Sequence, residues 1–174
     1  MQKKIVWLRI ITTALCVLML SFIFAQSLQT GQQSSQQSTA VTDVVQDVAQ
    51  DVAPDSFVAT AEGEDYNLLH SAVRKLAHYA EFALFGLLLC FCYATYTKKR
   101  IWALLPLGIL AVTPLIDEWL QTLTAERVAE WMDIAVDVCG GVTGFGIGLL
   151  TLTVVGACVR NAKKKKAQRI NSGI

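Results

Sequence analysis

Charged residues are scarce in this sequence: Asp, Glu, Lys and Arg make up 17% of its 174 residues, whereas hydrophobic residues make up 53%. A soluble domain of this length needs more charge to cover its solvated surface. Proline and histidine are also rare, with three and two residues. The scarcity of charge excludes an ordinary soluble domain and indicates a body embedded in lipid.

Cysteine is absent from the polar parts of the chain. All five cysteines lie within apolar runs, where a thiol is most simply a small buried hydrophobic group. Cys90 and Cys92 are two residues apart, so they lack the spacing of a redox or zinc motif. The sequence therefore predicts no disulfide framework.

Four apolar runs approach the length of about 20 residues that a helix needs to cross a hydrocarbon core of about 30 Å. The first run follows Lys3 and Lys4 and ends at the small residue Ala25, which would also fit a secretory signal. Its length exceeds the apolar region of a typical signal and favours an uncleaved anchor. We therefore expect an all-α fold, an integral membrane bundle of four transmembrane helices. The runs are 5–25, 76–96, 101–116 and 134–158.

Lys and Arg are missing from residues 26–65, and twelve of the fifteen basic residues fall on one side of the four runs. Short loops rich in Lys and Arg stay in the cytoplasm, so we predict that both termini are cytoplasmic. The basic run near the C-terminus follows an apolar run directly, which favours a stop-transfer flank over a nucleic-acid partner. The twelve residues are Lys3, Lys4, Arg9, Lys98, Lys99, Arg100, Arg160, Lys163, Lys164, Lys165, Lys166 and Arg169.

These patterns divide the chain into an N-terminal transmembrane anchor (1–25), an extracytoplasmic loop (26–66), a three-helix membrane domain (67–159) and a basic cytoplasmic tail (160–174). Residues 27–39 of the loop are rich in Gln and Ser, and we predict a disordered tether there. A repeat of four residues follows, which would place Val44, Val48 and Val52 on one side of a helix that ends at Pro54. This segment is either an amphipathic helix on the outer leaflet or a solvated acidic linker. Its few bulky apolar residues favour the linker.

Gly140, Gly144 and Gly148 recur every four residues in the fourth apolar run. Small residues at this spacing allow the backbones of two membrane helices to approach closely. We therefore predict that these glycines pack against a neighbouring helix rather than contact a ligand.

Three segments hold nearly all the polar residues expected at membrane level in this domain. Arg74, His78 and Glu81 follow one another at spacings of four and three residues, so they share one face of a helix. The second and fourth helices enter from outside and the third exits to outside, so all three segments should lie at one depth. The segments are Arg74, Lys75, His78 and Glu81; Asp117, Glu118 and Gln121; and Asp133 and Asp137, preceded by Arg127 and Glu130 in a short loop.

Charge pairs among these residues would hold the helices in register, but a polar bridge in a membrane contributes only on the order of 1 kcal/mol. Desolvating so many ionisable groups for that gain is unfavourable, so a functional pocket is the favoured interpretation. Glu118 and Glu130 are exceptions, because each has the alternative of pointing to water at a helix end.

The three segments, in this order, resemble the VanZ-like membrane family, which is named for a protein associated with resistance to glycopeptide antibiotics such as teicoplanin. The resemblance implies a multi-pass protein of the bacterial cytoplasmic membrane, a role in the cell envelope and an effect on glycopeptide susceptibility. Phe82 departs from the Tyr that is usual in the family, and Ala125-Glu126 replaces the usual Pro or Gly before the Arg. The match covers about residues 68–150 and rests on Arg74-Lys75-x-Ala77-His78-x-x-Glu81-Phe82-x-x-x-Gly86, Asp117-Glu118-x-x-Gln121, and Arg127 with Asp133-x-x-x-Asp137.

Binding of membrane lipid is the first function that fits the predicted pocket. An anionic headgroup, or a lipid-linked cell-wall precursor, would meet the cationic side chains, and Arg suits bidentate contact with phosphate or carboxylate. The predicted ligand-binding residues are Arg74, Lys75, Glu118, Gln121, Arg127 and Asp133.

Two further functions stay open. The first is a membrane-embedded hydrolase or transferase in which a His or Glu acts as base and acidic residues orient it or hold a divalent cation. No zinc signature matches the spacing, and the sequence specifies neither a cofactor nor an oligomeric state. The second is an accessory protein that docks a membrane partner through its glycines. The candidate catalytic residues are His78, Glu81, Asp117 and Asp137.

Overall fold

The structure, a computed structural model, describes residues 2–97, 104–125, 127 and 130–171. Within these residues all the regular secondary structure is α-helical, which confirms the all-α fold. The helices are α1 (Gln2–Ser27), α2 (Gly31–Val52), α3 (Phe57–Thr60), α4 (Glu64–Tyr96), α5 (Leu104–Thr122) and α6 (Trp131–Asn171).

Four of the described helices, α1, α4, α5 and α6, are long and apolar enough to cross a membrane, which confirms the four predicted spans. Their bounds differ from the apolar runs. Helix α4 begins three residues before the predicted start of the membrane domain, and α6 continues to Asn171. The segment 160–171, which belongs to the predicted basic tail, is therefore helical. Residues 98–103, which hold three of the basic residues counted above, lie outside the described residues.

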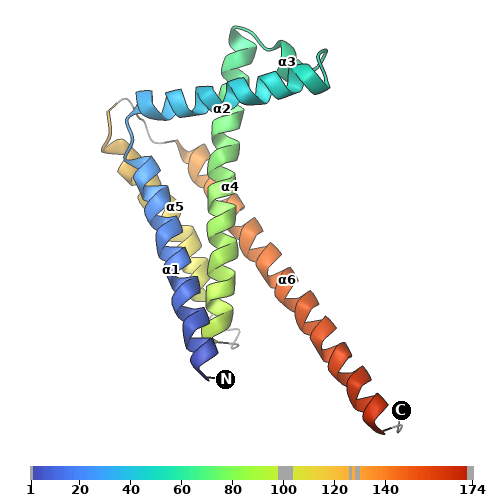
Figure 1. The fold of residues 1–174 in the computed structure, drawn as a ribbon. Helices are drawn as coiled ribbons and strands as arrows, with labels where there is room; N and C mark the ends of the chain where they lie inside the picture. The colour runs from blue at the N-terminus through green and yellow to red at the C-terminus, as the bar shows by residue number, and fades with distance from the viewer. Residues whose placement is uncertain (1, 98–103, 126, 128–129, 172–174) are drawn as a thin grey trace.

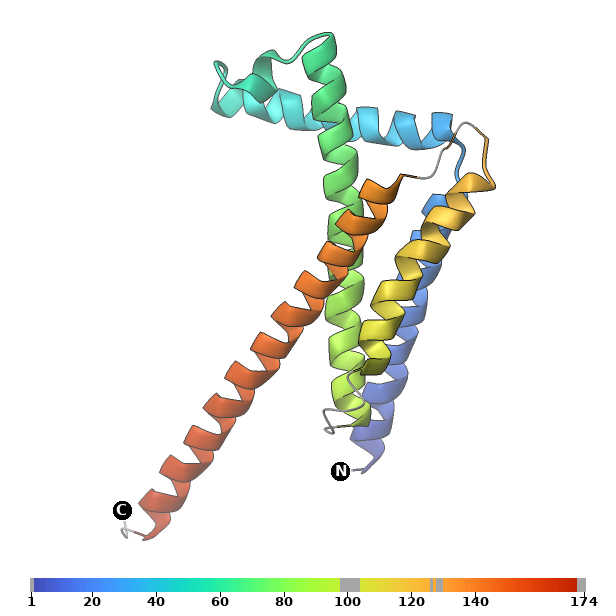
Figure 2. The same ribbon diagram turned by 180° about the vertical axis from the view of Figure 1, so that it is seen from behind.

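Figure 1 shows α1, α4 and α5 side by side, with α2 lying across one end of the bundle. Both termini lie at the opposite end. Helix α6 packs against α4 near its own beginning and then diverges from the other helices, as the view from behind also shows (Figure 2). We call the end beneath α2, where α4 and α6 approach each other and α5 ends, the polar end of the bundle.

Helix α2 corrects the prediction that residues 27–39 are a disordered tether. Its first turn is closed by a capping box, in which the Thr30 hydroxyl accepts from the Gln33 backbone and the Gln33 side chain accepts from the Thr30 backbone. Contacts with the rest of the chain hold it in place: Gly31 N donates to Ala125 O at 3.1 Å, and Tyr66 Oη donates to Asp43 at 2.6 Å. The helix ends at Val52, two residues before Pro54, as predicted.

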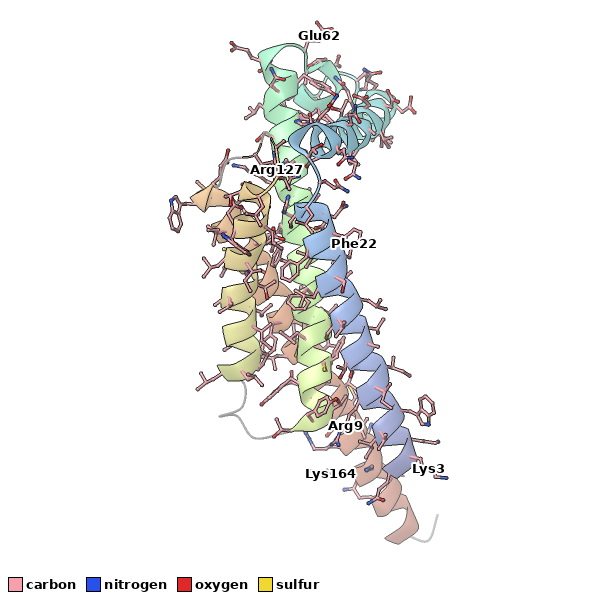
Figure 3. All side chains as sticks on the ribbon, turned by 90° about the vertical axis from the view of Figure 1, so that its left-hand side faces the viewer. Lys3, Arg9, Phe22, Glu62, Arg127 and Lys164 are labelled. Atoms are coloured by element: carbon pink, nitrogen blue, oxygen red, sulfur yellow. The ribbon has the colours of Figure 1, made fainter. Side chains whose placement is uncertain are left out.

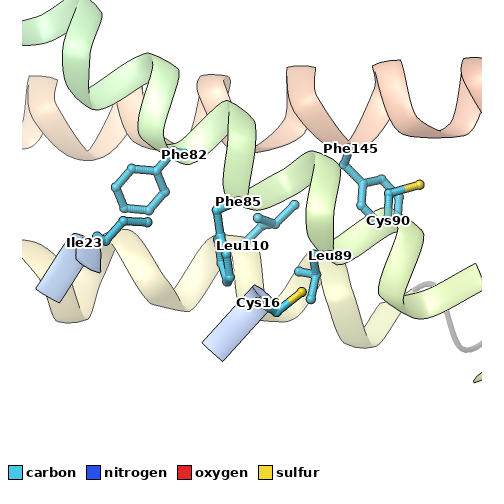
Figure 4. Packing of buried hydrophobic residues seen from close by; sticks show 8 residues of the cluster. All are labelled: Cys16, Ile23, Phe82, Phe85, Leu89, Cys90, Leu110 and Phe145. Atoms are coloured by element: carbon cyan, nitrogen blue, oxygen red, sulfur yellow. The ribbon is translucent and has the colours of Figure 1, made fainter. Parts of the chain in front are cut away.

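The apolar core lies where α1, α4, α5 and α6 meet, below the polar end (Figure 4). Phe82 and Phe85 are fully buried there, although aliphatic side chains elsewhere on the four long helices are widely exposed. Exposed aliphatic side chains on spanning helices would face lipid tails without cost. The core cluster consists of Cys16, Ile23, Phe82, Phe85, Leu89, Cys90, Leu110 and Phe145.

All five cysteines are free, and two of them correct the expectation that they are buried. Cys139 and Cys158 lie on exposed parts of α6, whereas Cys16 and Cys90 belong to the core. The exposed pair lies on a helix that has few neighbours along much of its length (Figure 2). A thiol is apolar enough for such a position.

The glycines of α6 pack against α4, as predicted. A Cβ added at Gly140 would overlap the carbonyl oxygen of Tyr79, and one added at Gly144 would overlap that of Ala83. At Gly148 an added Cβ would lie 2.8 Å from the Cβ of Cys90. The lack of a side chain at these three positions of α6 therefore allows the two helices to lie this close together.

Replacing Gly144 with Ala is expected to lower the free energy of unfolding by about 1–3 kcal/mol, because the new methyl group overlaps the backbone of α4. Gly146→Ala is the matched control, since an added Cβ there has nothing within 4 Å. Thermal unfolding of the two variants in detergent micelles measures the difference. Equal stability of the two variants would contradict the close contact between α4 and α6.

Candidate functional site

The polar end brings together residues that are far apart in the sequence. Helices α4 and α6 both run away from this end, whereas α5 ends there, so each delivers its ionisable residues to the same depth. His78, Asp117 and Asp137 each offer one ligand atom, and these atoms all lie within 4.8 Å of one another. The predicted convergence of the three segments is therefore confirmed, while the roles of the residues remain predictions.

Asp117 is fully buried and is held by two hydrogen bonds. Gln121 Nε2, one turn later on α5, donates to Asp117 Oδ2 at 3.0 Å. The Ser27 hydroxyl, at the end of α1, donates to Asp117 Oδ1. Both donors are themselves buried, so the carboxylate has a fixed position inside the bundle.

Ser27 was missed by the sequence analysis, which placed it in a disordered tether. The sequence gives only a weak indication of this role: Ser27 is a single hydroxyl residue two positions after the first apolar run, at the depth where the third run ends. The structure shows that α1 extends through this residue and that the Ser27 side chain is 1% exposed. The first helix therefore contributes to the site as well as anchoring the chain.

Glu118 and Glu130 differ from each other. Glu118 is buried, and its Oε1 atom accepts a hydrogen bond from the Glu130 backbone at 2.5 Å, so it does not point to water. The Glu130 side chain is exposed, as one of the two alternatives had it. Glu118 therefore anchors the beginning of α6, because it binds a backbone N–H just before the first turn.

The outer part of the site is a set of long ion pairs. Arg74 and Lys75 each lie 3.9 Å from a carboxylate oxygen of Asp133, and Lys75 lies equally far from Glu130. Deeper in the bundle, His78 Nδ1 lies 3.8 Å from Asp137 Oδ1. These distances exceed those of hydrogen bonds, so the pairs attract each other without a direct hydrogen bond.

Arg127 is a half-buried cation without a carboxylate partner among the described residues. Its Nε and Nη1 atoms are buried and donate to no hydrogen-bond acceptor in the described part of the chain, and the same holds for Arg74 Nε. Burial, followed by the nearby charge of Arg74, lowers the pKa of the Arg127 guanidinium. The loop thus holds a cation that an anion would stabilise, since Arg keeps its proton in proteins.

A cavity of about 190 Å³ lies between α2 and α4. The wall on α4 carries Arg74, His78 and Glu81, and Arg127 reaches it from the loop before α6. A wider depression of about 900 Å³ opens outside it and is lined by Arg74, Arg127 and Glu130 together with α2. The sequence analysis also missed the neutral lining on the side of α1 and α2, which is formed by Gln26, Gln29, Ser34, Gln37 and Ser38.

The predicted site residues therefore fall into two layers. The deep layer joins His78 to the buried groups of α5 and α6, and the outer layer holds the cations with their partners. Glu81 lines the cavity on the same wall as His78. The deep layer is His78, Asp117, Gln121 and Asp137, and the outer layer is Arg74, Lys75, Arg127, Glu130 and Asp133.

Four candidate spans and an ionisable cluster at one end define a polytopic helical protein of the membrane type. The model of the VanZ/LLP1 family matches residues 12–152, which is most of the chain, and the chain belongs to that family. The match includes the end of α1 and all of α2, both of which line the cavity. Neither the curated proteins nor the solved structures gave a match.

Ser27→Ala is expected to lower the free energy of unfolding by about 1–3 kcal/mol, because it removes a donor to the buried Asp117 carboxylate. Ser21→Ala is the matched control, since Ser21 is an exposed residue of the same helix. Chemical or thermal unfolding in detergent measures both variants. A loss no larger for Ser27 than for Ser21 would argue against a structural role for this hydrogen bond.

Proposed function

We propose that this VanZ/LLP1 protein binds the phosphate-bearing headgroup of a membrane lipid in the cavity between α2 and α4. The observation that carries the proposal is the pair of guanidinium groups at the cavity, Arg74 and Arg127, with buried N–H groups that lack a hydrogen-bond partner among the residues that the structure describes. Unpaired buried donors are unfavourable, and an anion with several acceptor oxygens satisfies them.

The location of the site supports a lipid as the source of the phosphate. The cavity lies at the end of helices whose outer faces are apolar, so a headgroup can occupy it while its tails stay among the lipids. Arg74 and Arg127 can each present two parallel N–H groups to a phosphate, in a planar geometry that the ammonium group of Lys lacks. Both a glycerophospholipid and a lipid-linked cell-wall precursor carry this group.

The basic residues support an outward-facing site on the bacterial cytoplasmic membrane. Lys3, Arg9 and Lys164 lie at the end opposite to Arg127 (Figure 3). Basic residues flanking spans favour the cytoplasm, so the polar end then faces outward with both termini inside. Envelope precursors and the glycopeptides that bind them are found on that outer side, which connects the proposal with the resistance for which the family is named.

The double variant Arg74→Ala/Arg127→Ala is expected to weaken lipid binding at least tenfold, on the order of what one charged hydrogen bond contributes. Native mass spectrometry and titration of nanodiscs measure it, with phosphatidylglycerol in one arm and a polyprenyl diphosphate in the other. Lys164→Ala is the matched control, since it removes a basic residue at the opposite end of the bundle.

Tighter binding of one of the two lipids by the wild-type protein would show which class of lipid supplies the phosphate. Unchanged binding of both lipids by the double variant would overturn the proposal. In cells, the double variant is expected to lose whatever effect the wild-type chain has on teicoplanin susceptibility, whereas Lys164→Ala retains it. If both variants affected susceptibility equally, the cavity would have no specific role in resistance.

The position of His78 favours a second function, a phosphoester hydrolase. His78 lines the same cavity as the two arginines and lies beside Asp137. In such a reaction the imidazole accepts a proton from water while the water oxygen attacks phosphorus, the bond from phosphorus to the lipid oxygen breaks, and that oxygen takes the proton from the imidazolium and leaves as the neutral alcohol. Glu81, on the same wall, is the other candidate base.

His78→Ala is expected to abolish release of phosphate from lipid by the purified protein if the chain is a hydrolase. His70→Ala is the control, because His70 lies on the same helix and contacts Ser35 O of α2 instead. Turnover is measured as phosphate released from the lipid that binds best. Absence of turnover by the wild-type protein leaves lipid binding as the function.

A further inference from the structure

We propose that His78, Asp117 and Asp137 form a binding site for a divalent transition-metal cation at the floor of the headgroup cavity. The three residues come from α4, α5 and α6, and their ligand atoms lie within 4.8 Å of one another. Ligands bound to one ion at about 2.0–2.2 Å lie roughly 3–4 Å apart. Small rotations of the side chains are therefore enough to enclose an ion.

Unpartnered atoms point to a missing ligand at this place. Asp137 is 1% exposed, and its Oδ1 atom has no hydrogen-bond partner within the described ranges. The facing atom, His78 Nδ1, likewise has none there, although the two atoms are only 3.8 Å apart. A cation between them would accept electron pairs from both atoms and remove the cost of leaving them unpaired.

The surroundings of Asp117 are those of an oriented metal ligand. Ser27 and Gln121 each donate to one of its oxygens and fix the plane of the carboxylate, and each oxygen keeps a second lone pair. Outer hydrogen bonds of this kind hold ligands in position and strengthen metal binding. The hydrogen bonds thus account for the orientation of Asp117 but leave room for coordination.

Charge in the deep layer also favours a cation. Asp117 and Asp137 are both buried within the bundle, and the third member of the cluster, His78, carries an imidazole rather than a permanent positive charge. Among the described residues, Arg74 and Lys75 form ion pairs with Asp133 and Glu130 in the outer layer, not with these two carboxylates. Two buried carboxylates at this separation repel each other, and a divalent cation replaces that repulsion with attraction.

The donor set indicates the class of metal. One imidazole nitrogen with two carboxylates suits Mn²⁺, Fe²⁺ or Zn²⁺, whereas Mg²⁺ and Ca²⁺ favour sites made of oxygen alone. His78 also lines the cavity, so an open coordination position would face the bound headgroup. On this assignment His78 is a ligand, and Glu81 remains as the candidate base of a hydrolase.

Mn²⁺ is the probe that separates this site from the thiols, because Zn²⁺ also binds cysteines such as the exposed Cys139 and Cys158. Full-length protein treated with chelator is titrated with Mn²⁺, and free Mn²⁺ is followed by electron paramagnetic resonance. We expect one Mn²⁺ per chain, at least tenfold weaker binding in Asp137→Asn and His78→Gln, and little change in the exposed Asp65→Asn control.

Melting temperatures without metal show whether each variant is folded. If a variant of a metal ligand unfolds, the Mn²⁺ affinity of Ser27→Ala provides a second test of the site. Ser27→Ala keeps all three ligands, so weakened Mn²⁺ binding by about tenfold supports the site. Equal Mn²⁺ affinity in the wild type, Asp137→Asn and His78→Gln would overturn it. Retention of one Mn²⁺ by Arg74→Ala/Arg127→Ala would show that the metal site stands even where headgroup binding fails.

Discussion

Burying carboxylates among membrane-spanning helices is costly, and the arrangement of the polar end depends on how that cost is offset. Asp117 and Asp137 come from different helices and lie out of contact with solvent. Hydrogen bonds from Ser27 and Gln121 stabilise the first, but the second has an unpaired oxygen. The cation proposed above would satisfy the remaining atoms.

The depth of the cluster is fixed by backbone contact rather than by the charges. Gly140 and Gly144 allow α6 to lie against the backbone of α4, and this contact sets where Asp137 faces His78. A larger side chain at either glycine would move the carboxylate away from the imidazole. One face of α6 carries acidic residues near its beginning and glycines one and two turns later. The close packing of the two helices therefore also determines the position of the acidic side chains in the site.

Much of this structure follows from the sequence by two simple rules. Hydropathy and length predicted four spans, and the alternating direction of the helices then predicted that His78, Asp117 and Asp137 would meet. Helix α2 and Ser27 were missed because they depend on tertiary contacts. A segment rich in Gln and Ser has too little apolar surface to predict a helix, yet the capping box at Thr30 and contacts with α4 and Ala125 hold one. Thr30 and Gln33 carried the only local signal.

Helix α6 has the mechanical form of a lever. It is held against α4 near Gly144, while its later part diverges from its neighbours (Figures 1 and 2). At 1.5 Å per residue, the arm from Gly144 to Asp137 is about 10 Å long and the arm to Asn171 about 40 Å. A tilt about this fulcrum that shifts Asp137 by about 1 Å would displace the far end by about 4 Å. Occupancy at one face of the membrane would thereby be amplified into motion at the other.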